Sequence, residues 1–487
     1  MTEKIKSFLF HNTSQGQTVL KNTFWLSFGQ LSSRLIRAVI IIFAARILGA
    51  AGYGVFSYAL SLAGFFTIFS DIGITAFLTR EGSKGPEFRE RFIATGFVTK
   101  LVLIAANSVV ILLAAPLLTK TPGVAELLPI AIILFAFDSI RDFTTGIARS
   151  LERMEIEASV LFIMNVSVLL LGLAALFAFP NSFVLMCAYT VGSGIGMAFS
   201  LWKLRVHFKN IFSRFDLSVV KTLITEAWPF GVAGLLNTVM LNTDTIMLGW
   251  WRTPEEIGYY SAAQRIIMLL YLLPGFIAVS TFPTLARLAK ENAAAFRTVL
   301  EKALRAIFFM AFPLIAGGVV VADPLIRFIF GPEYAPTGPV LRILLFTFIV
   351  VFPGALIGNA IFSYNKQKYL IYAFTLGAFG NVALNALLIP RFGIEGSAAA
   401  TIITQILSNG CAFLIMHRIN PFRVFALLPR IILASVIMGV CAYFLLLAGS
   451  HIVVILAISI LVYIAALWLL KEKLVTDLRT QMRSIFG

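Results

Sequence analysis

The chain has 487 residues, of which 59% are hydrophobic and 13% are charged, and its mean hydropathy is +0.92. Soluble domains carry about 25% charged residues, so this composition excludes a soluble enzyme, a disordered chain and a secreted disulfide scaffold. The formal net charge of +16 is typical of membrane proteins that gather Lys and Arg in cytoplasmic loops, and we expect no nucleic-acid partner.

The apolar stretches predict an all-α polytopic membrane protein with about 14 transmembrane helices. A helix needs about 20 mostly apolar residues to cross a bilayer, and charged or Pro/Gly segments separate such stretches here. The expected spans are 23–47, 53–78, 92–116, 124–149, 157–179, 182–204, 226–250, 257–283, 301–322, 338–364, 369–389, 394–417, 425–448 and 451–470.

The loop charges indicate the orientation of these spans. With the N-terminus in the cytoplasm, the cytoplasmic loops hold 29 Lys and Arg, including Lys100 in the 80–100 region, and the opposite loops hold 6. Positively charged loops stay on the cytoplasmic side. We therefore expect a multi-pass protein of the plasma (inner) membrane with both termini cytoplasmic.

A weak internal repeat suggests two six-helix lobes. The segment Gly54-Val-Phe-Ser aligns with Gly258-Tyr-Tyr-Ser, and a predicted span follows both. Six helices per lobe is an even number, so the lobes are expected to be parallel repeats, a pattern found in transporters. The expected organisation is a cytoplasmic tail (1–22), an N-lobe (23–210), a cytoplasmic linker (211–225), a C-lobe (226–420), two extra C-terminal helices (421–470) and a cytoplasmic tail (471–487).

The chain lacks the motifs that would indicate an enzyme. It contains no GxxxxGK[ST], HExxH or GxSxG motif and no cluster with metal-ligand spacing. We therefore expect no catalysis, no cofactor and no metal.

Polar side chains inside the spans are the candidates for substrate binding, because charge within a bilayer is costly and normally faces a partner or a hydrated cavity. Gln30, Arg34 and Arg37 share one face of the first span, and Gln264 and Arg265 lie in the eighth. A guanidinium stays charged and matches phosphate or carboxylate oxygens. The alternative is that the arginines only hold the bundle, by pairing with an acidic neighbour.

Two aspartates, Asp71 and Asp244, are those neighbours, and they are also candidates for ion coupling. In the fourth span, Asp138, Arg141 and Asp142 have spacings of three and four residues. Such an internally neutralised cluster indicates a structural or gating role more than substrate contact.

Proline–glycine pairs inside two spans are candidate hinges for alternating access. They are Pro274 with Gly275, and Pro353 with Gly354. Proline removes a backbone hydrogen bond and can kink a helix. Fixed kinks are the alternative interpretation.

The sequence resembles the Wzx-type polysaccharide-export flippases of the multidrug/oligosaccharidyl-lipid/polysaccharide (MOP) superfamily. The similar segments are KNTFW at 21–25, ARILG at 45–49, YGVFSYA at 53–59, DIGI at 71–74, IGYYSAAQR at 257–265 and FPTLAR at 282–287. The resemblance implies two lobes around a central cavity with alternating access. It also implies cationic residues at Arg34 or Arg37 and at Arg265, and an extra helix pair that holds a lipid tail.

The expected function is therefore that of a flippase. It would move a polyprenyl-(di)phosphate-linked oligosaccharide, a unit of O-antigen, capsule or exopolysaccharide type, from the cytoplasmic to the external leaflet. A cation-coupled multidrug (MATE-like) antiporter and a lipid II-type flippase remain as alternatives. The expected partners are this substrate, membrane lipids and a polysaccharide polymerase machinery, with coupling to H⁺ or Na⁺ left open.

Overall fold

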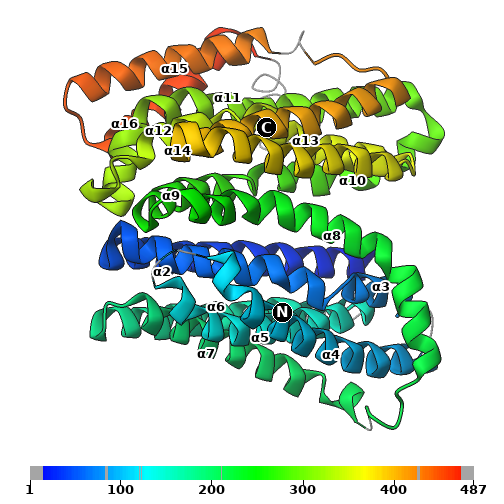
Figure 1. Ribbon diagram of the computed structural model, residues 1–487. Coiled ribbons are helices and arrows are strands. Elements are labelled where there is room, and N and C mark those ends of the chain that lie inside the picture. Colours follow the sequence, from blue (N-terminus) through cyan, green and yellow to red (C-terminus); the bar gives the residue numbers. More distant parts are fainter. Residues whose placement is uncertain are drawn as a thin grey trace, which may run out of the picture. The chain divides into compact units, whose positions relative to one another are not determined.

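The structure is a computed structural model that describes residues 15–82, 86–119, 121, 123–209, 211–424 and 428–472. Every regular element in these residues is helical (Figure 1). The α-helices up to residue 251 are α2 (Gln15–Thr67), α3 (Ile74–Glu81), α4 (Pro86–Leu118), α5 (Val124–Ser150), α6 (Met154–Ala178), α7 (Ser182–Lys203) and α8 (Leu217–Trp251). They are followed by α9 (Pro254–Leu270), α10 (Leu273–Glu291), α11 (Ala293–Phe330), α12 (Thr337–Leu345), α13 (Phe348–Ser363), α14 (Lys368–Ile419), α15 (Pro429–Leu447) and α16 (Ile452–Leu469). Short 3₁₀ turns are η1 (Ile68–Ser70), η2 (Arg205–Phe208) and η3 (Pro332–Tyr334).

The expected all-α polytopic membrane fold is confirmed. Within the described residues, ten helices are long and apolar enough to cross a membrane, or eleven if the bent pair α12–α13 counts as one span. The number is below fourteen because α2 and α14 each contain two predicted spans, and because α5 holds too many charges to pass as apolar. Each predicted span nevertheless overlaps a helix.

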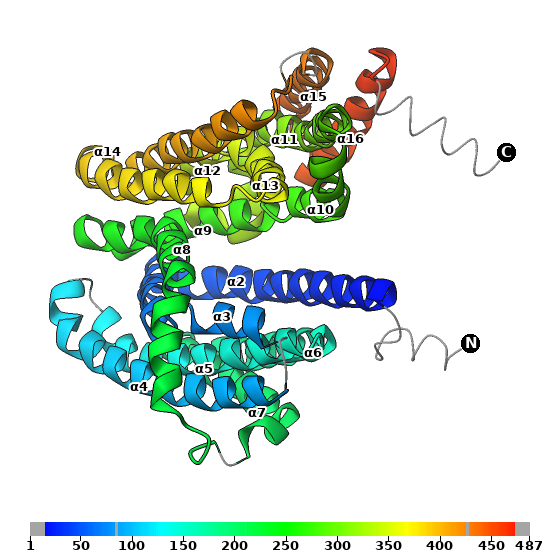
Figure 2. The ribbon, with the colours of Figure 1, turned by 90° about the vertical axis from the view of Figure 1, so that its right-hand side faces the viewer.

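Single glycines join the paired spans of α2 and α14. Gly49 has a φ of 66° and Gly393 a φ of 61°, in the region that glycine occupies without steric penalty. Ser397 Oγ donates to Asn385 Oδ1 at 2.9 Å across the Gly393 kink. Residues twelve apart in a straight helix lie about 18 Å apart, so the chain reverses at this glycine. Figure 2 shows the yellow and orange halves of α14 side by side.

The second predicted span, 53–78, is broken rather than continuous. The α2 helix ends at Thr67, η1 follows, and α3 begins at Ile74. At the break, Ile72 has a φ of 42° and Gly73 a φ of 89°. A left-handed conformation is rare for a β-branched residue, so tertiary packing must hold this segment.

The chain forms two compact units, Met1–Gly258 and Tyr259–Gly487. In the first unit, α2 packs against α5, α6 and α7, and α8 packs against α2, α3 and α4. In the second, α11 packs against α15, which pairs with α16, and α13 packs against α10, α11 and α14. The helix α8 therefore belongs to the first compact unit of the structure, whereas the sequence repeat assigns it to the second lobe. The lobe boundaries at 211–225 stay a prediction.

Candidate functional site

The first span carries the predicted arginines on an exposed face. The side chains of Gln30, Arg34 and Arg37 are all exposed on the first half of α2. Arg37 Nε donates to Asn165 Oδ1 on α6 at 3.3 Å, and the Asn165 amide donates to Ser33 Oγ at 2.8 Å. Asn165 itself is almost fully buried. The α6 helix therefore orients the Arg37 guanidinium while leaving it accessible.

In the second unit, Gln264 and Arg265 lie next to each other on α9, and both side chains are half-buried. The Nε atom of Arg265 is enclosed and has no hydrogen-bond partner among the described residues. An enclosed donor without a partner costs about 1–3 kcal/mol, so this atom favours an added acceptor such as a water or an anionic oxygen. Arg265 and the arginines of α2 belong to different units, and their union in one site remains a prediction.

The predicted coupling residue Asp71 is one half of an internal ion pair. Its carboxylate binds Lys100 Nζ of α4 and the hydroxyl of Thr75 on α3. Lys100 is only 1% exposed, and its ammonium lies 5.9 Å from the centre of the Phe143 ring. Counting Lys100 among the loop charges is therefore wrong. Its position inside the predicted span 92–116 is the feature of the sequence that indicates a residue within a span and not in a loop.

This ion pair lies at the break between α2 and α3. The strained pair Ile72 and Gly73 packs directly on α8, where a Cβ added at Gly73 would lie 2.3 Å from the Ala227 carbonyl oxygen. A Cβ at Gly231 would likewise lie 2.7 Å from the Ile72 carbonyl oxygen. The glycines permit this close backbone approach, and the ion pair fixes α4 to the same point. Broken membrane helices with polar groups beside them are typical of secondary transporters.

The cluster on α5 forms as its spacing predicts. The buried guanidinium of Arg141 binds Asp138 and, at 2.8 Å, Asp142 Oδ1. Ser193 on α7 donates to Asp138 Oδ1 at 2.5 Å, so the cluster also joins two helices. The second predicted coupling residue, Asp244, is 1% exposed on α8. The described residues contain no group of His, Cys, Asp and Glu arranged to hold a metal ion.

The predicted hinge residues occupy two different settings. Pro274 and Gly275 lie at the start of α10, directly after the helix break that ends α9, and a Cβ added at Gly275 would meet nothing within 4 Å. Pro353 lies inside the continuous helix α13, and a Cβ at Gly354 would lie 1.9 Å from Asn409 Oδ1 of α14. The bend between α12 and α13, of 44°, lies at Phe346–Thr347, ahead of this proline.

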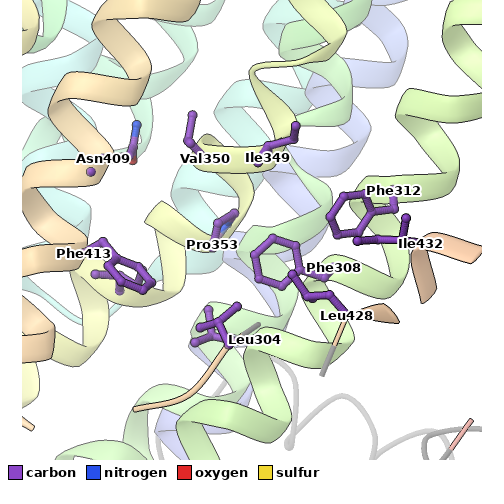
Figure 3. Close-up of a pocket in the computed structure, with 13 residues that line it drawn as sticks. Leu304, Phe308, Phe312, Ile349, Val350, Pro353, Asn409, Phe413, Leu428 and Ile432 are labelled. Atoms are coloured by element: carbon purple, nitrogen blue, oxygen red, sulfur yellow. The ribbon is translucent and has the colours of Figure 1, made fainter. Parts of the chain in front are cut away.

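An apolar pocket of about 400 Å³ in the second unit was not predicted from the sequence. Its lining residues come from α11, α13, α14 and the entry to α15, and their side chains converge on one space (Figure 3). They are Leu304, Phe308, Phe312, Ile349, Val350, Pro353, Ile357, Asn409, Gly410, Phe413, Val424, Leu428 and Ile432. Asn409 is the polar side chain in this lining. The composition suits an alkyl or prenyl group and not a charged ligand.

This chain has a broken span, charged residues within its spans and an apolar pocket. Broken spans and charges within spans are typical of polytopic membrane transporters. The chain belongs to the polysaccharide biosynthesis protein family, whose model matches residues 19–289, more than half of its length. A second family model, MatE, matches residues 229–387.

Named relatives and solved structures agree with this membership. A Haloferax volcanii protein, "Probable low-salt glycan biosynthesis flippase Agl15", is 23% identical over 75% of this chain and 76% of its own. The "Capsular polysaccharide biosynthesis protein CapF" of Staphylococcus aureus is 20% identical over 80% of this chain and 96% of its own. The structure titled "Lipid II flippase MurJ, inward closed conformation" shares the fold, with a TM-score of 0.75, 16% identity and coverage of 92% of this chain and 99% of that one.

Proposed function

We propose that this protein is a flippase that carries a polyprenyl-(di)phosphate-linked oligosaccharide from the cytoplasmic to the external leaflet by alternating access. The observation that carries the proposal is the set of guanidinium groups inside predicted spans, above all Arg265, whose enclosed Nε has no hydrogen-bond partner in the part of the chain that the structure describes. Membership of the polysaccharide biosynthesis protein family supports the same function.

The arginines supply the contact to the phosphate. A guanidinium fork presents parallel N–H donors that match phosphate oxygens, and it remains charged at every physiological pH. Arg34, Arg37 and Arg265 bind the (di)phosphate in this proposal, with Gln30 and Gln264 beside them as neutral donors and acceptors. The sugar occupies a hydrated cavity.

The apolar pocket and the helix pair α15–α16 receive part of the prenyl chain. The pocket lining is almost wholly aliphatic and aromatic, and Ile432 brings α15 into it. Apolar area removed from water stabilises a bound chain by about 25 cal/mol per Å², although a prenyl chain leaving lipid gains far less. The pocket therefore orients the tail more than it adds affinity.

The membrane potential drives the substrate outward. With the interior negative, exporting one net negative charge gains about 2.3 kcal/mol per 100 mV. In this proposal both termini are cytoplasmic, and a polymerase machinery receives the substrate on the outside. Asp71 and Asp244 are the residues to test for H⁺ or Na⁺ coupling. The Lys100 partner makes Asp71 the weaker candidate, because an internal cation competes with an incoming one.

The test is to purify the protein from cells that make a surface polysaccharide and to identify the bound lipids by mass spectrometry. Arg265→Ala and Arg34→Ala are expected to lose the polyprenyl-phosphate species and to reduce polymer export at least tenfold. The matched control is Arg391→Ala, an exposed arginine near the α14 kink, which should behave as wild type. Wild-type protein without any such lipid, together with full export by both variants, would refute the proposal.

The match to the MatE model over 229–387 favours one second candidate, a cation-coupled multidrug antiporter. That function requires uptake of cationic dyes into inverted vesicles under a pH gradient. The flippase proposal expects no such uptake.

A further inference from the structure

The connection between α7 and α8 presents a surface of unusual composition. The term interfacial segment here means residues 202–217 without Asn210. Four of its apolar side chains are strongly exposed, namely Trp202 at 53%, Val206 at 64%, Phe212 at 77% and Leu217 at 74%. A loop in water rarely exposes so many large apolar groups in so short a stretch.

Other residues of the interfacial segment hold it against the helices of the first unit. Leu204 is buried, and the ring of Phe208 packs edge-on against Phe97 of α4, with centroids 5.1 Å apart. Asp216 N–H donates to Thr95 Oγ1 at 3.1 Å, and its carboxylate pairs with Arg91. The exposed apolar groups therefore stand on a backbone that is tied to α4 through Phe208 and Asp216.

The charge that remains exposed on the interfacial segment is positive. Its acidic residue, Asp216, is neutralised by Arg91, and Arg214 is neutralised by Glu90. Lys203 and Arg205 lie 4.8 and 5.8 Å from the centre of the Trp202 ring, so the two cations and the indole form one exposed group. Their positive charge is directed outward together with the apolar side chains.

We propose that the interfacial segment is a binding surface for anionic phospholipids of the leaflet that it faces. The segment joins the end of one span to the start of the next, so it lies at the depth of the headgroups. Indole rings favour that depth, and Lys and Arg there attract anionic headgroups. The apolar side chains enter the acyl region while Lys203 and Arg205 bind the phosphate. The chemistry differs from that of the flippase proposal, and neither depends on the other.

The experiment titrates the purified full-length protein with phosphatidylglycerol or phosphatidylcholine and counts bound lipids by native mass spectrometry. Wild type is expected to prefer phosphatidylglycerol. The double variant Lys203→Gln/Arg205→Gln should reduce that preference about thirtyfold, because each basic residue near an anionic surface contributes about 1 kcal/mol and about 1.4 kcal/mol corresponds to tenfold.

A control variant separates this surface from other sources of binding. Arg327→Gln/Arg391→Gln removes the same charge elsewhere and should keep the preference. An equal loss in this control, or no lipid preference in wild type, would overturn the proposal.

A second readout measures depth. A Phe212→Cys variant, made in a background where Cys187, Cys411 and Cys441 are serine, carries a fluorescent label in vesicles. Strong quenching by lipids brominated near the headgroup supports the proposal. Quenching only by a water-soluble quencher would place the surface in water and refute it.

Discussion

The unit Met1–Gly258 has, besides ion pairs at its loops, two sets of ion pairs inside its predicted spans, whereas the described ion pairs of Tyr259–Gly487 lie near the ends of its predicted spans. In the first unit Lys100 of α4 pairs with Asp71 at the break after α2, and Arg141 pairs with Asp138 one turn away on the same helix, α5. In the second, Arg305 pairs with Glu472, and Arg342 with Asp323. The second unit also contains the apolar pocket.

The difference teaches how each unit keeps its shape. A charge pair within a bilayer is stable only at close and fixed geometry, because either ion alone is strongly penalised there. The first unit is therefore locked at defined points, including the strained break at Ile72 and Gly73. The second unit keeps its described ion pairs near the span ends, and the packing of its span interiors leaves a space that a flexible apolar chain can fill.

The largest expected effect comes from breaking one internal pair. Lys100→Met should destabilise the protein by about 3–5 kcal/mol, because it leaves the Asp71 carboxylate without its cation. The double variant Lys100→Met/Asp71→Asn should recover most of this loss. Denaturation of the detergent-solubilised protein measures both. In the second unit, Arg342→Met removes a half-exposed pair and should cost less than about 1 kcal/mol. A Lys100→Met variant as stable as Arg342→Met would contradict the comparison.

The next effect tests packing in the second unit. Gly354→Ala should destabilise by about 1–3 kcal/mol, since the new Cβ overlaps Asn409 Oδ1. Asn409→Ala in the same chain should relieve the overlap, and the unfolding midpoints of single and double variants measure the relief. If Asn409→Ala restores nothing, the close contact between α13 and α14 is not the cause.

A smaller effect separates a hinge from a fixed kink. Gly275→Ala meets no neighbour within 4 Å, so it should stabilise the protein by about 0.5–1 kcal/mol through helix propensity alone. If Pro274 and Gly275 form a hinge, the same variant slows export. Unchanged export with the expected gain in stability would identify a fixed kink.

The pocket offers a similar test. A Cβ at Gly410 meets nothing within 4 Å, and Gly410 lines the cavity, so Gly410→Leu should fill space without a clash at its Cβ. We expect unchanged or slightly higher stability and reduced export if the pocket holds the prenyl chain. Export assays and thermal unfolding of the same preparation measure the two effects, and wild-type export would exclude the pocket from substrate binding.

The smallest effect concerns a surface pair outside the spans. Hydrogen bonds from Ser218 and from Arg91 hold the pKa of Asp216 at about 2. A lowered folded pKa contributes stability above the unfolded pKa, about 3.9, and this contribution is lost as pH falls toward 2. The difference in unfolding temperature between wild type and Asp216→Asn should therefore be constant from pH 8 to pH 5. A difference that shrinks already near pH 6 would contradict the lowered pKa.

Hydropathy alone predicts the helices of this chain well, because a bilayer requires long apolar segments and long apolar segments form helices there. It does not predict the break at 68–73, which depends on Gly231 of α8 and on Lys100 of α4. The position of a lysine within a span does not reveal which carboxylate it meets. The bend at Phe346–Thr347 likewise lies more than a full turn ahead of Pro353, where the proline does not predict it.

Part of the candidate site can likewise be predicted from the sequence, and part of it depends on tertiary packing. Sequence spacing alone predicts the cluster of Asp138, Arg141 and Asp142, since one helix turn brings the three together. The Asn165 partner of Arg37 comes from a helix more than a hundred residues later, which no local pattern indicates. The apolar pocket was missed because its lining is ordinary span sequence whose convergence depends on how four segments pack.

The reversal of α14 at Gly393 has a consequence for handling the protein. Two spans are joined there by one glycine instead of a loop, and a Cβ at Gly396 would lie 2.4 Å from the Leu388 carbonyl oxygen. The exposed residues at this turn, such as Arg391, are helical, so a protease finds no extended segment to cut there, and an epitope tag inserted there would separate helices that need direct contact. The two spans therefore form a single helical hairpin, and topology reporters belong elsewhere in the chain.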